Sequence, residues 1–308
     1  MNRNLSSRVA RAGAVLAATC LIASLAACGN SGSTNNGAAS TMTAKVDKLA
    51  AMVPDSIAKK GTLVVAGATY PPAIIEPANG SDPTGWDVEN TRQIAAVLGL
   101  KVEFKIIPFD GVITGLAGNR YDAATGEIYV TPERTQSVTF VTNHASTDAL
   151  LVSANSPIAS AEKEDDLCGH TLAAELGSAE AALIHETAKN CAAKGKPALT
   201  VKTFQAQAQV NLALKEGRID GAVSSASQVA YVLSQTGKDF KLVELPWAPD
   251  HATGLALARN ADSAQFAKAV QAATDHLIEN GELQKILDKF NDGQGAIKKA
   301  EILPANAG

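Results

Sequence analysis

Short apolar runs alternate with segments of helical periodicity through the first part of the chain. Residues 61–68 form an apolar run bounded by glycine, which predicts a buried strand. Residues 86–98 repeat apolar positions at helical spacing, and residues 101–107 alternate polar and apolar positions as a half-buried strand does. A helix over about 110–116 and a strand over 121–125 complete a β-α-β-α-β series. This order is typical of a parallel sheet with crossover helices.

The same order returns farther along the chain. Strands are predicted near residues 170–174, 199–203 and 217–223, and each is followed by a segment with helical spacing. Residues 142–148 are polar and lack helical periodicity, and a second connecting segment follows the strand-like residues 242–245, near residues 246–253. We interpret them as two crossings between lobes. The predicted fold class is therefore α/β, with two lobes built on parallel-type sheets.

The polar turn after the third strand of the first lobe carries a candidate ligand group. Thr131 suits a helix N-cap, Pro132 suits the first helical position and Glu133 suits the first turn. Arg134 would then lie near the carboxyl end of a strand, where open α/β sheets bind ligands. A guanidinium held there can grip a carboxylate through two parallel hydrogen bonds. The alternative is a surface arginine paired with Glu133 or Glu127.

The first residues have the pattern of an export signal. Three arginines precede an apolar run over residues 12–27, which is too short to span a bilayer comfortably. The run ends in Leu25-Ala26-Ala27-Cys28-Gly29, which resembles a bacterial lipobox. Residues 1–27 are therefore predicted to be a lipoprotein signal peptide, with lipid attached to Cys28. Ordinary secretory cleavage is the alternative.

A flexible tether is predicted to follow the lipid anchor. It covers residues 28–52 and is rich in Asn, Gly, Ser, Thr and Ala over much of its length. Such a composition cannot bury a core. The expected location is thus outside the cell, anchored to the outer face of the membrane through Cys28.

Charge and cysteine content narrow the class of protein. Three of the 27 basic residues lie in the leader, which leaves the rest of the chain with a formal charge of about −7. A nucleic-acid partner is therefore not expected. Cys168 and Cys191 remain as a pair in an oxidising compartment, which favours a disulfide. A metal site with His170 and His185 is the weaker alternative, because no C-x-x-C spacing is present.

Eight short segments, taken in order, resemble the polar amino-acid solute-binding proteins of bacterial ABC importers. The resemblance covers about residues 60–295. The segments are Ala66-Gly67-Ala68-Thr69-Tyr70-Pro71-Pro72, Thr84-Gly85-Trp86-Asp87-Val88, Pro108-Phe109-Asp110-Gly111-Val112-Ile113, Tyr121-Asp122-Ala123-Ala124, Thr131-Pro132-Glu133-Arg134, Asp166-Leu167-Cys168-Gly169, Leu214-Lys215-Glu216-Gly217-Arg218-Ile219-Asp220 and Gly281-Glu282-Leu283-Gln284-Lys285-Ile286.

The resemblance implies a two-lobed periplasmic-binding-protein-like fold of type II. Lobe 1 would comprise residues 53–146 and 252–308, and lobe 2 residues 147–251, with hinges near 142–148 and 246–253. The lobes would close on a small polar solute, an amino acid or a derivative. The expected partners are that solute and an ABC permease in the membrane. Neither cofactor nor metal is expected, and the protein is expected to act as a monomer.

The resemblance also assigns roles at the site. Arg134 matches the family's arginine that binds the ligand α-carboxylate. Tyr70 and Phe109 match positions that sandwich the ligand side chain. Ser178 lies in the glycine turn of the second lobe that supplies hydroxyl and amide donors.

Three departures from the family pattern bear on ligand choice. The family usually has an acidic residue at the position of Gly67 or Ala68, and none is present here. Ser225 stands where an aspartate usually binds the α-ammonium, and a hydroxyl cannot neutralise that charge. Glu127 and Tyr129 stand where small residues are usual. A glutamate there would either pair with Arg134 or receive a cation of the ligand itself. We therefore count Glu127, Tyr129 and Ser225 among the candidate ligand-binding residues.

Two other functions were weighed. An enzyme of the same fold, a dehydratase or lyase, would need an acid/base pair, for which Glu127 with His144 or His251 is the candidate set. Both histidines are more simply solvated residues of the crossings. No G-x-S-x-G or H-E-x-x-H signature is present, so an enzyme is not expected. A lipid-anchored solute sensor is the other alternative.

Overall fold

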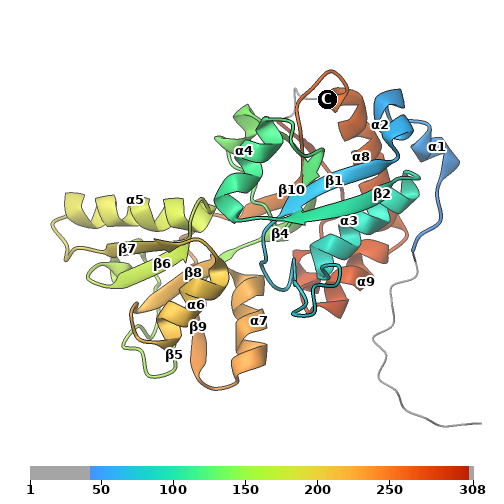
Figure 1. Cartoon of the computed structure of the whole chain (residues 1–308). Helices are drawn as coiled ribbons and strands as arrows, with labels where there is room; N and C mark the ends of the chain where they lie inside the picture. Colours follow the sequence, from blue (N-terminus) through green and yellow to red (C-terminus); the bar gives the residue numbers. More distant parts are fainter. Residues whose placement is uncertain (1–41, 305–308) are drawn as a thin grey trace, which may run out of the picture. The chain divides into compact units, whose positions relative to one another are not determined.

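Two mixed β-sheets carry the fold, and the chain crosses between them twice (Figure 1). The computed structural model describes residues 42–304, and these belong to one compact unit. The predicted signal peptide and the predicted lipid site at Cys28 lie outside the described residues. Within residues 42–304, none of the helices has the length and apolar character needed to cross a membrane.

The first sheet has the strand order β11-β4-β10-β3-β1-β2. Helices α3, α8 and α9 pack on one of its faces and α4 packs on the other. The elements of this part are α1 (Asp47–Ala50), α2 (Asp55–Lys60), β1 (Thr62–Gly67), α3 (Trp86–Val97), β2 (Lys101–Ile106), η1 (Phe109–Gly111), α4 (Val112–Ala117), β3 (Ala123–Ala124), η2 (Arg134–Gln136), β4 (Thr139–Ser146), β10 (His251–Leu257), α8 (Ser263–Glu279), α9 (Glu282–Lys289), η4 (Gly293–Gly295) and β11 (Ile302–Leu303).

The second sheet has the strand order β7-β6-β8-β5-β9. Helix α5 packs on one face, and α6 and α7 pack on the other. Its elements are β5 (Asp148–Ser153), η3 (Glu164–Leu167), β6 (Thr171–Glu175), α5 (Ala179–Ala193), β7 (Thr200–Phe204), α6 (Gln207–Lys215), β8 (Gly221–Ser225), α7 (Ala226–Thr236) and β9 (Phe240–Glu244).

The predicted parallel pairing holds only in part of each sheet. β1 runs parallel to β2 and β3, and β6 runs parallel to β7 and β8. β10 is antiparallel to β3 and β4, and β5 is antiparallel to β8 and β9. The reason lies in the crossings. A chain that leaves a sheet along one strand and returns along its neighbour must run those two strands in opposite directions.

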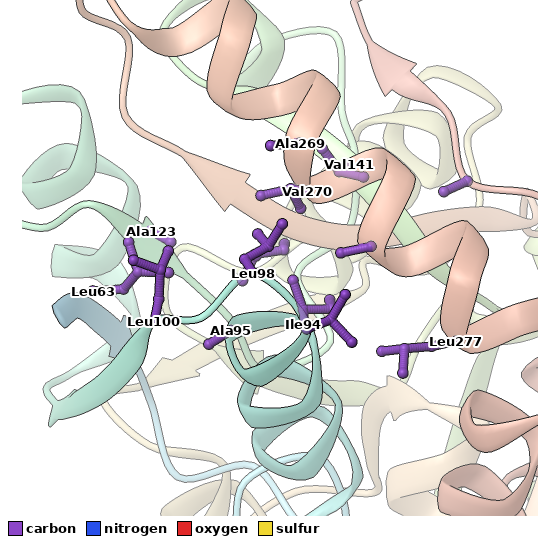
Figure 2. Close-up of a cluster of buried hydrophobic side chains, with 14 of the residues drawn as sticks. Leu63, Ile94, Ala95, Leu98, Leu100, Ala123, Val141, Ala269, Val270 and Leu277 are labelled. Carbon is purple, nitrogen blue, oxygen red and sulfur yellow. The ribbon is translucent and has the colours of Figure 1, made fainter. Parts of the chain in front are cut away.

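The core of the first sheet explains the apolar stripe predicted for α3. Ile94 and Leu98 pack with Val270 and Leu277 of α8, all almost fully buried (Figure 2). Burying each such side chain contributes roughly 1.5–3 kcal/mol. The packed helix holds its first turn, and hence Asp87, against the loops at the carboxyl ends of β1 and β3.

The predicted tether extends too far toward the folded part. The Val46 backbone N–H donates to the Val97 carbonyl at 3.0 Å. Val46, Leu49 and Met52 pack against the core of the first sheet. These apolar side chains occur at helical spacing, and this makes packing more favourable than solvation.

The predicted disulfide is present. Cys168 and Cys191 are joined, with their Cα atoms 5.7 Å apart, and they fasten α5 to the segment before β6. The disulfide therefore anchors the helix whose first turn contributes to the site described next.

Candidate functional site

A narrow cleft lies where loops of the two sheets meet. It gathers most of the residues that the sequence singled out: all the predicted ligand-binding side chains except Ser225 line it. Its walls are formed by Tyr70, Phe109, Gly126, Glu127, Tyr129, Arg134, Glu175, Ser178, Ala179 and Glu180.

Arg134 lies in the cleft with a fixed guanidinium. Its Nη1 donates to the Tyr129 carbonyl at 2.8 Å, and its Nη2 donates to the Gly177 carbonyl at 3.1 Å. The guanidinium also stacks 5.3 Å from the centre of the Phe109 ring. Thr131 Oγ1 accepts from the Arg134 backbone N–H, as predicted for a cap, but only the short 3₁₀ turn η2 follows. Burial lowers the pKa of Arg134, against the opposing field of Glu180.

Tyr70 connects the two sheets. Its hydroxyl accepts from the Ser225 backbone N–H at 2.9 Å and lies 3.1 Å from Ser225 Oγ. Ser225 Oγ in turn accepts from the Gln228 N–H and caps α7. Ser225 is fully buried behind Tyr70 and does not line the cleft. Its position supports the aromatic wall rather than direct contact with a ligand.

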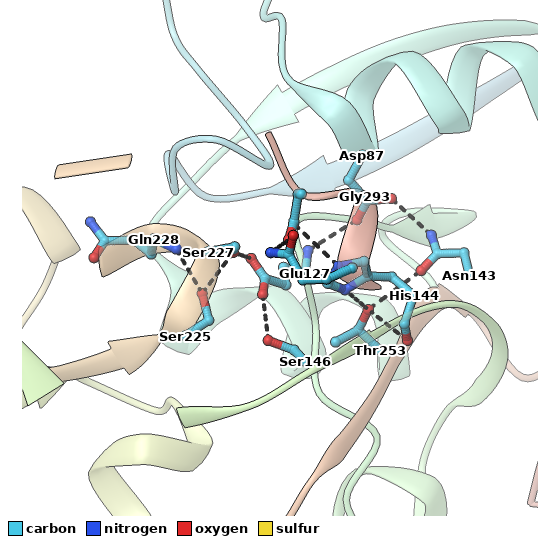
Figure 3. Close-up of polar contacts among 12 residues, drawn as sticks. Asp87, Glu127, Asn143, His144, Ser146, Ser225, Ser227, Gln228, Thr253 and Gly293 are labelled. Atoms are coloured by element: carbon cyan, nitrogen blue, oxygen red, sulfur yellow. Dashed lines mark hydrogen bonds and ion pairs between the residues drawn. The ribbon is translucent and has the colours of Figure 1, made fainter. Parts of the chain in front are cut away.

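Glu127 bridges the two sheets through serine hydroxyls (Figure 3). Ser146 of β4 donates to its Oε1 and Ser227 of α7 donates to its Oε2, each at 2.8 Å. Among the ion pairs of residues 42–304, none joins Glu127 to Arg134. Burial raises the pKa of Glu127 to about 7, against the lowering field of His144. The glutamate therefore fastens the lobes together in this conformation.

The backbone of Glu127 is held as firmly as its side chain. Its φ is +56°, a left-handed conformation that is uncommon for a residue other than glycine. Asp87 Oδ2 accepts from the N–H groups of Gly126 and Glu127 at 2.8 and 3.0 Å. Asp87 Oδ1 accepts from the Asn143 amide at 2.8 Å. A strained backbone held by buried bonds is typical of functional positions.

The prediction that His144 is solvated is wrong. It is 1% exposed, its ring centre lies 4.5 Å from that of Trp86, and its Nε2 lies 3.2 Å from Asp292 Oδ2. Burial lowers the pKa of His144, but Asp292 and Glu127 outweigh burial and raise it. Asp292 follows α9, so a segment distant in sequence packs on β4 at His144. His144 is thus part of the packed interior and lies outside the cleft lining.

His251 also differs from the solvated linker residue that was predicted, because it forms an aromatic pair beside the cleft. Tyr129 is 3% exposed and stacks on His251 with ring centres 4.1 Å apart. His251 Nε2 lies 3.2 Å from Asp148 Oδ2. Burial raises the pKa of Tyr129, and the field of Glu180 adds to that rise. The Tyr129 ring therefore forms an uncharged part of the cleft wall.

Two buried carboxyl groups in the cleft were missed from the sequence. Glu175 ends β6 and is 3% exposed, and Glu180 lies in the first turn of α5 and is 7% exposed. Burial, and then Glu180, raise the pKa of Glu175 to about 8. Burial, and then Asp148, raise the pKa of Glu180 to about 7. Their only sequence signal was that both flank the glycine turn at Ser178, whose Oγ accepts from the Ala181 N–H at 3.0 Å.

The raised pKa values of Glu127, Glu175 and Glu180 predict that the free energy of unfolding falls as the pH rises. Their folded pKa values lie above the value of 4.5 for a free carboxyl, so the folded state binds their protons more tightly. Stability is then fully present below about pH 4.5 and is lost as the pH rises through about 7 to 8. The loss is up to about 1.4 kcal/mol per pH unit and group.

Thermal unfolding by circular dichroism at pH 5, 6, 7 and 8 checks this dependence. We expect the midpoint to fall across the series, and Glu175→Gln to flatten the fall between pH 6 and 8, because glutamine keeps the volume without titrating. A wild-type midpoint that rises from pH 5 to 8 would contradict the prediction.

Comparison with known proteins places this geometry in a family. The profile of the bacterial extracellular solute-binding proteins, family 3, matches residues 63–293. The L-cystine-binding protein TcyA of Bacillus subtilis (strain 168) is 30% identical over 272 residues, which cover 87% of this chain and 92% of that protein. The probable amino-acid-binding protein YxeM of the same organism is 29% identical, and the similarity covers 90% of this chain and 93% of that protein.

Solved structures show the same two-lobed architecture. An ancestral arginine-binding protein bound to arginine is similar with a TM-score of 0.66 and 27% identity. The similarity covers 75% of this chain and 98% of that one.

Proposed function

Because the chain belongs to the bacterial extracellular solute-binding proteins of family 3, we propose that it captures a polar amino acid or amino-acid-like solute and delivers it to the permease of an ABC importer. Relatives carry names for L-cystine, arginine or unspecified amino acids. The capture step requires a group that recognises the carboxylate shared by all amino acids. Arg134 is that group in this chain.

The arrangement around Arg134 carries the proposal. Its guanidinium is held by the Tyr129 and Gly177 carbonyls, which occupy two of its five N–H donors. The remaining donors can bind a carboxylate in the cleft, where low polarity strengthens the ion pair. Tyr70 and Phe109 flank the same space and offer apolar faces to the rest of the solute.

Contacts between the lobes support capture by hinge closure. Tyr70 bonds to Ser225 and Glu127 bonds to Ser227, and in each pair the partners come from different sheets. Arg134 also reaches across to Gly177. Closure would therefore assemble the walls of the cleft and exclude water from the bound solute. The lobe boundaries given above, with hinges near 142–148 and 246–253, are part of this proposal.

The histidine positions support a binding protein rather than an enzyme of the same fold. An acid/base pair must reach a ligand in the cleft. His144 is enclosed by Trp86 and Asp292, and His251 is stacked behind Tyr129. Neither ring lines the cleft with Glu127. The proposal further includes export, anchoring through a lipidated Cys28, and action as a monomer.

A thermal-shift and calorimetric screen tests the proposal. The chain without residues 1–28 would be mixed with each of the twenty common L-amino acids, L-cystine and, as a control, glycerol. We expect at least one amino acid to bind with a dissociation constant in the micromolar range or below, raising the unfolding midpoint by several degrees. If no amino acid binds at millimolar concentration, the proposed function is wrong. Slow conversion of a bound compound would favour the enzyme alternative.

A further inference from the structure

The acidic wall of the cleft has a role beyond binding a carboxylate. We propose that Glu180, supported by Glu175, receives the cationic nitrogen of the solute, so that the site selects compounds carrying a free ammonium or amidinium group close to a carboxylate. This inference rests on the proposed function. It identifies the group that recognises the cationic nitrogen of the solute, in addition to Arg134, which recognises the carboxylate. N-acylated amino acids are then excluded from the solute class.

The position of Glu180 relative to Arg134 is the first argument. Glu180 lies in the first turn of α5, the helix after the turn at Gly177, and the Gly177 carbonyl accepts from Arg134 Nη2 at 3.1 Å. The two side chains line the same cleft, and each lies in the electrostatic field of the other. In an amino acid the carboxylate and the ammonium are joined through a single carbon. An ammonium acceptor must therefore lie close to the carboxylate clamp, as Glu180 does.

The second argument is that, among the described residues, no ion pair neutralises Glu175 or Glu180. Both carboxylate side chains are buried, with exposed fractions of 7% for Glu180 and 3% for Glu175. The backbone groups near these carboxyls, those of Gln207 and of Glu180 itself, lower the two pKa values by less than burial raises them. A carboxylate buried beside a cavity without a cation is costly unless a bound cation compensates for it.

The third argument is that the competing acceptors are already engaged or buried away from the cleft. Both oxygens of Glu127 already accept from serine hydroxyls. Ser225, which stands where the family's ammonium-binding aspartate was expected, is buried behind Tyr70. Of the other two carboxyl groups that line the cleft, Glu180 acts on the pKa of Arg134, whereas Glu175 is not among the groups that do. Glu180 is therefore the acceptor that a different element, α5, supplies in place of the missing aspartate.

A charge balance leads to the same class of solute. The cleft is lined by one guanidinium and three carboxyl groups. A solute carboxylate balances Arg134, and a solute cation favours the ionised form of Glu180 by lowering its raised pKa. A dicarboxylate without a cation would add negative charge to a wall that is already acidic, so it should be rejected.

Calorimetry with matched ligands and variants tests the inference. The ligands are L-arginine, L-glutamine, L-alanine and L-cystine, each with its Nα-acetyl derivative. The proteins are the wild type, Glu180→Gln, Glu175→Gln and the control Glu216→Gln, whose carboxylate is exposed and pairs with Arg218. Glutamine preserves the size of the side chain, and circular dichroism confirms that each variant is folded.

For each free amino acid that binds the wild type, we expect Nα-acetylation to weaken binding about 100-fold or more. We expect Glu180→Gln to weaken binding about 30-fold or more, Glu175→Gln to weaken it less, and Glu216→Gln to leave it unchanged. Equal binding of the acetylated ligand, or affinity within threefold of wild type in Glu180→Gln, would overturn the inference while leaving the proposed function intact. A wild type that binds none of the amino acids of the screen overturns the proposed function and, with it, the inference.

Discussion

Replacing Arg134 by alanine should abolish solute binding while the chain stays folded. The guanidinium is the only arginine or lysine side chain that lines the described cleft, so the variant leaves a ligand carboxylate without a counter-charge. Losing one partner of a buried, hydrogen-bonded ion pair costs about 2–5 kcal/mol, or roughly 30- to several-thousand-fold in affinity. Titration calorimetry with the best ligand of the screen measures the loss.

Arg259→Ala is the matched control for this experiment. Arg259 also donates to backbone carbonyls of the segment that follows the cleft, those of Thr135 at 2.8 Å and Gln136 at 3.0 Å. It does not line the cleft. We expect this variant to bind as the wild type does. Equal losses in both variants would show that Arg134 acts by shaping its loop, and unchanged affinity in Arg134→Ala would exclude the clamp.

The positions of the site residues could be predicted where the signal is local. A short apolar strand followed by Thr131, Pro132 and Arg134 identifies both a turn and the edge of the sheet at which it lies. The family resemblance pointed to Tyr70 and Phe109, which lie in the segments that follow β1 and β2. Local signals also predicted α3 and the disulfide.

What could not be predicted depends on partners distant in sequence. Ser227, which bonds Glu127, lies 100 residues away, and Asp292, which buries His144, lies still farther. Glu180 was missed because an acidic residue in the first turn of a helix is already explained by the helix dipole. Its functional importance becomes visible only when the fold places it beside Arg134. The antiparallel pairing of β4 with β10 likewise follows from topology rather than from residue pattern.

The family resemblance supplied the expected ammonium site but not its replacement. The sequence showed that an aspartate was absent at Ser225 and pointed to Glu127 as the substitute. The structure shows Glu127 engaged by two hydroxyls and places a different carboxyl group, that of Glu180, in the cleft. A departure from a family pattern therefore identifies where specificity changes. The residue that compensates for it can be identified only from the three-dimensional structure.

Gly85→Ala should prevent stable folding, because this residue sets the start of α3 and so the position of Asp87. Its φ is +122°, a conformation that L side chains rarely adopt, and an added Cβ would lie 2.2 Å from the Ala73 carbonyl oxygen. The Pro72 and Ala73 carbonyls accept from the N–H groups of Trp86 and Asp87, so backbone rather than a movable side chain would have to shift. We expect a loss of more than about 4 kcal/mol in the free energy of unfolding.

Chemical denaturation of Gly85→Ala and Gly80→Ala in parallel distinguishes two effects: the steric clash of the added Cβ, and the conformational cost of replacing a glycine that has a positive φ. Gly80 lies in the preceding loop with φ +71°, and its added Cβ would have no heavy atom within 4 Å. We expect it to lose only about 1 kcal/mol, the cost of a left-handed conformation in a residue with a Cβ. Similar losses in both variants would mean that conformation alone decides the result. A stable Gly85→Ala protein that still binds its solute would show that α3 can begin elsewhere and that Asp87 does not need this turn to hold Glu127.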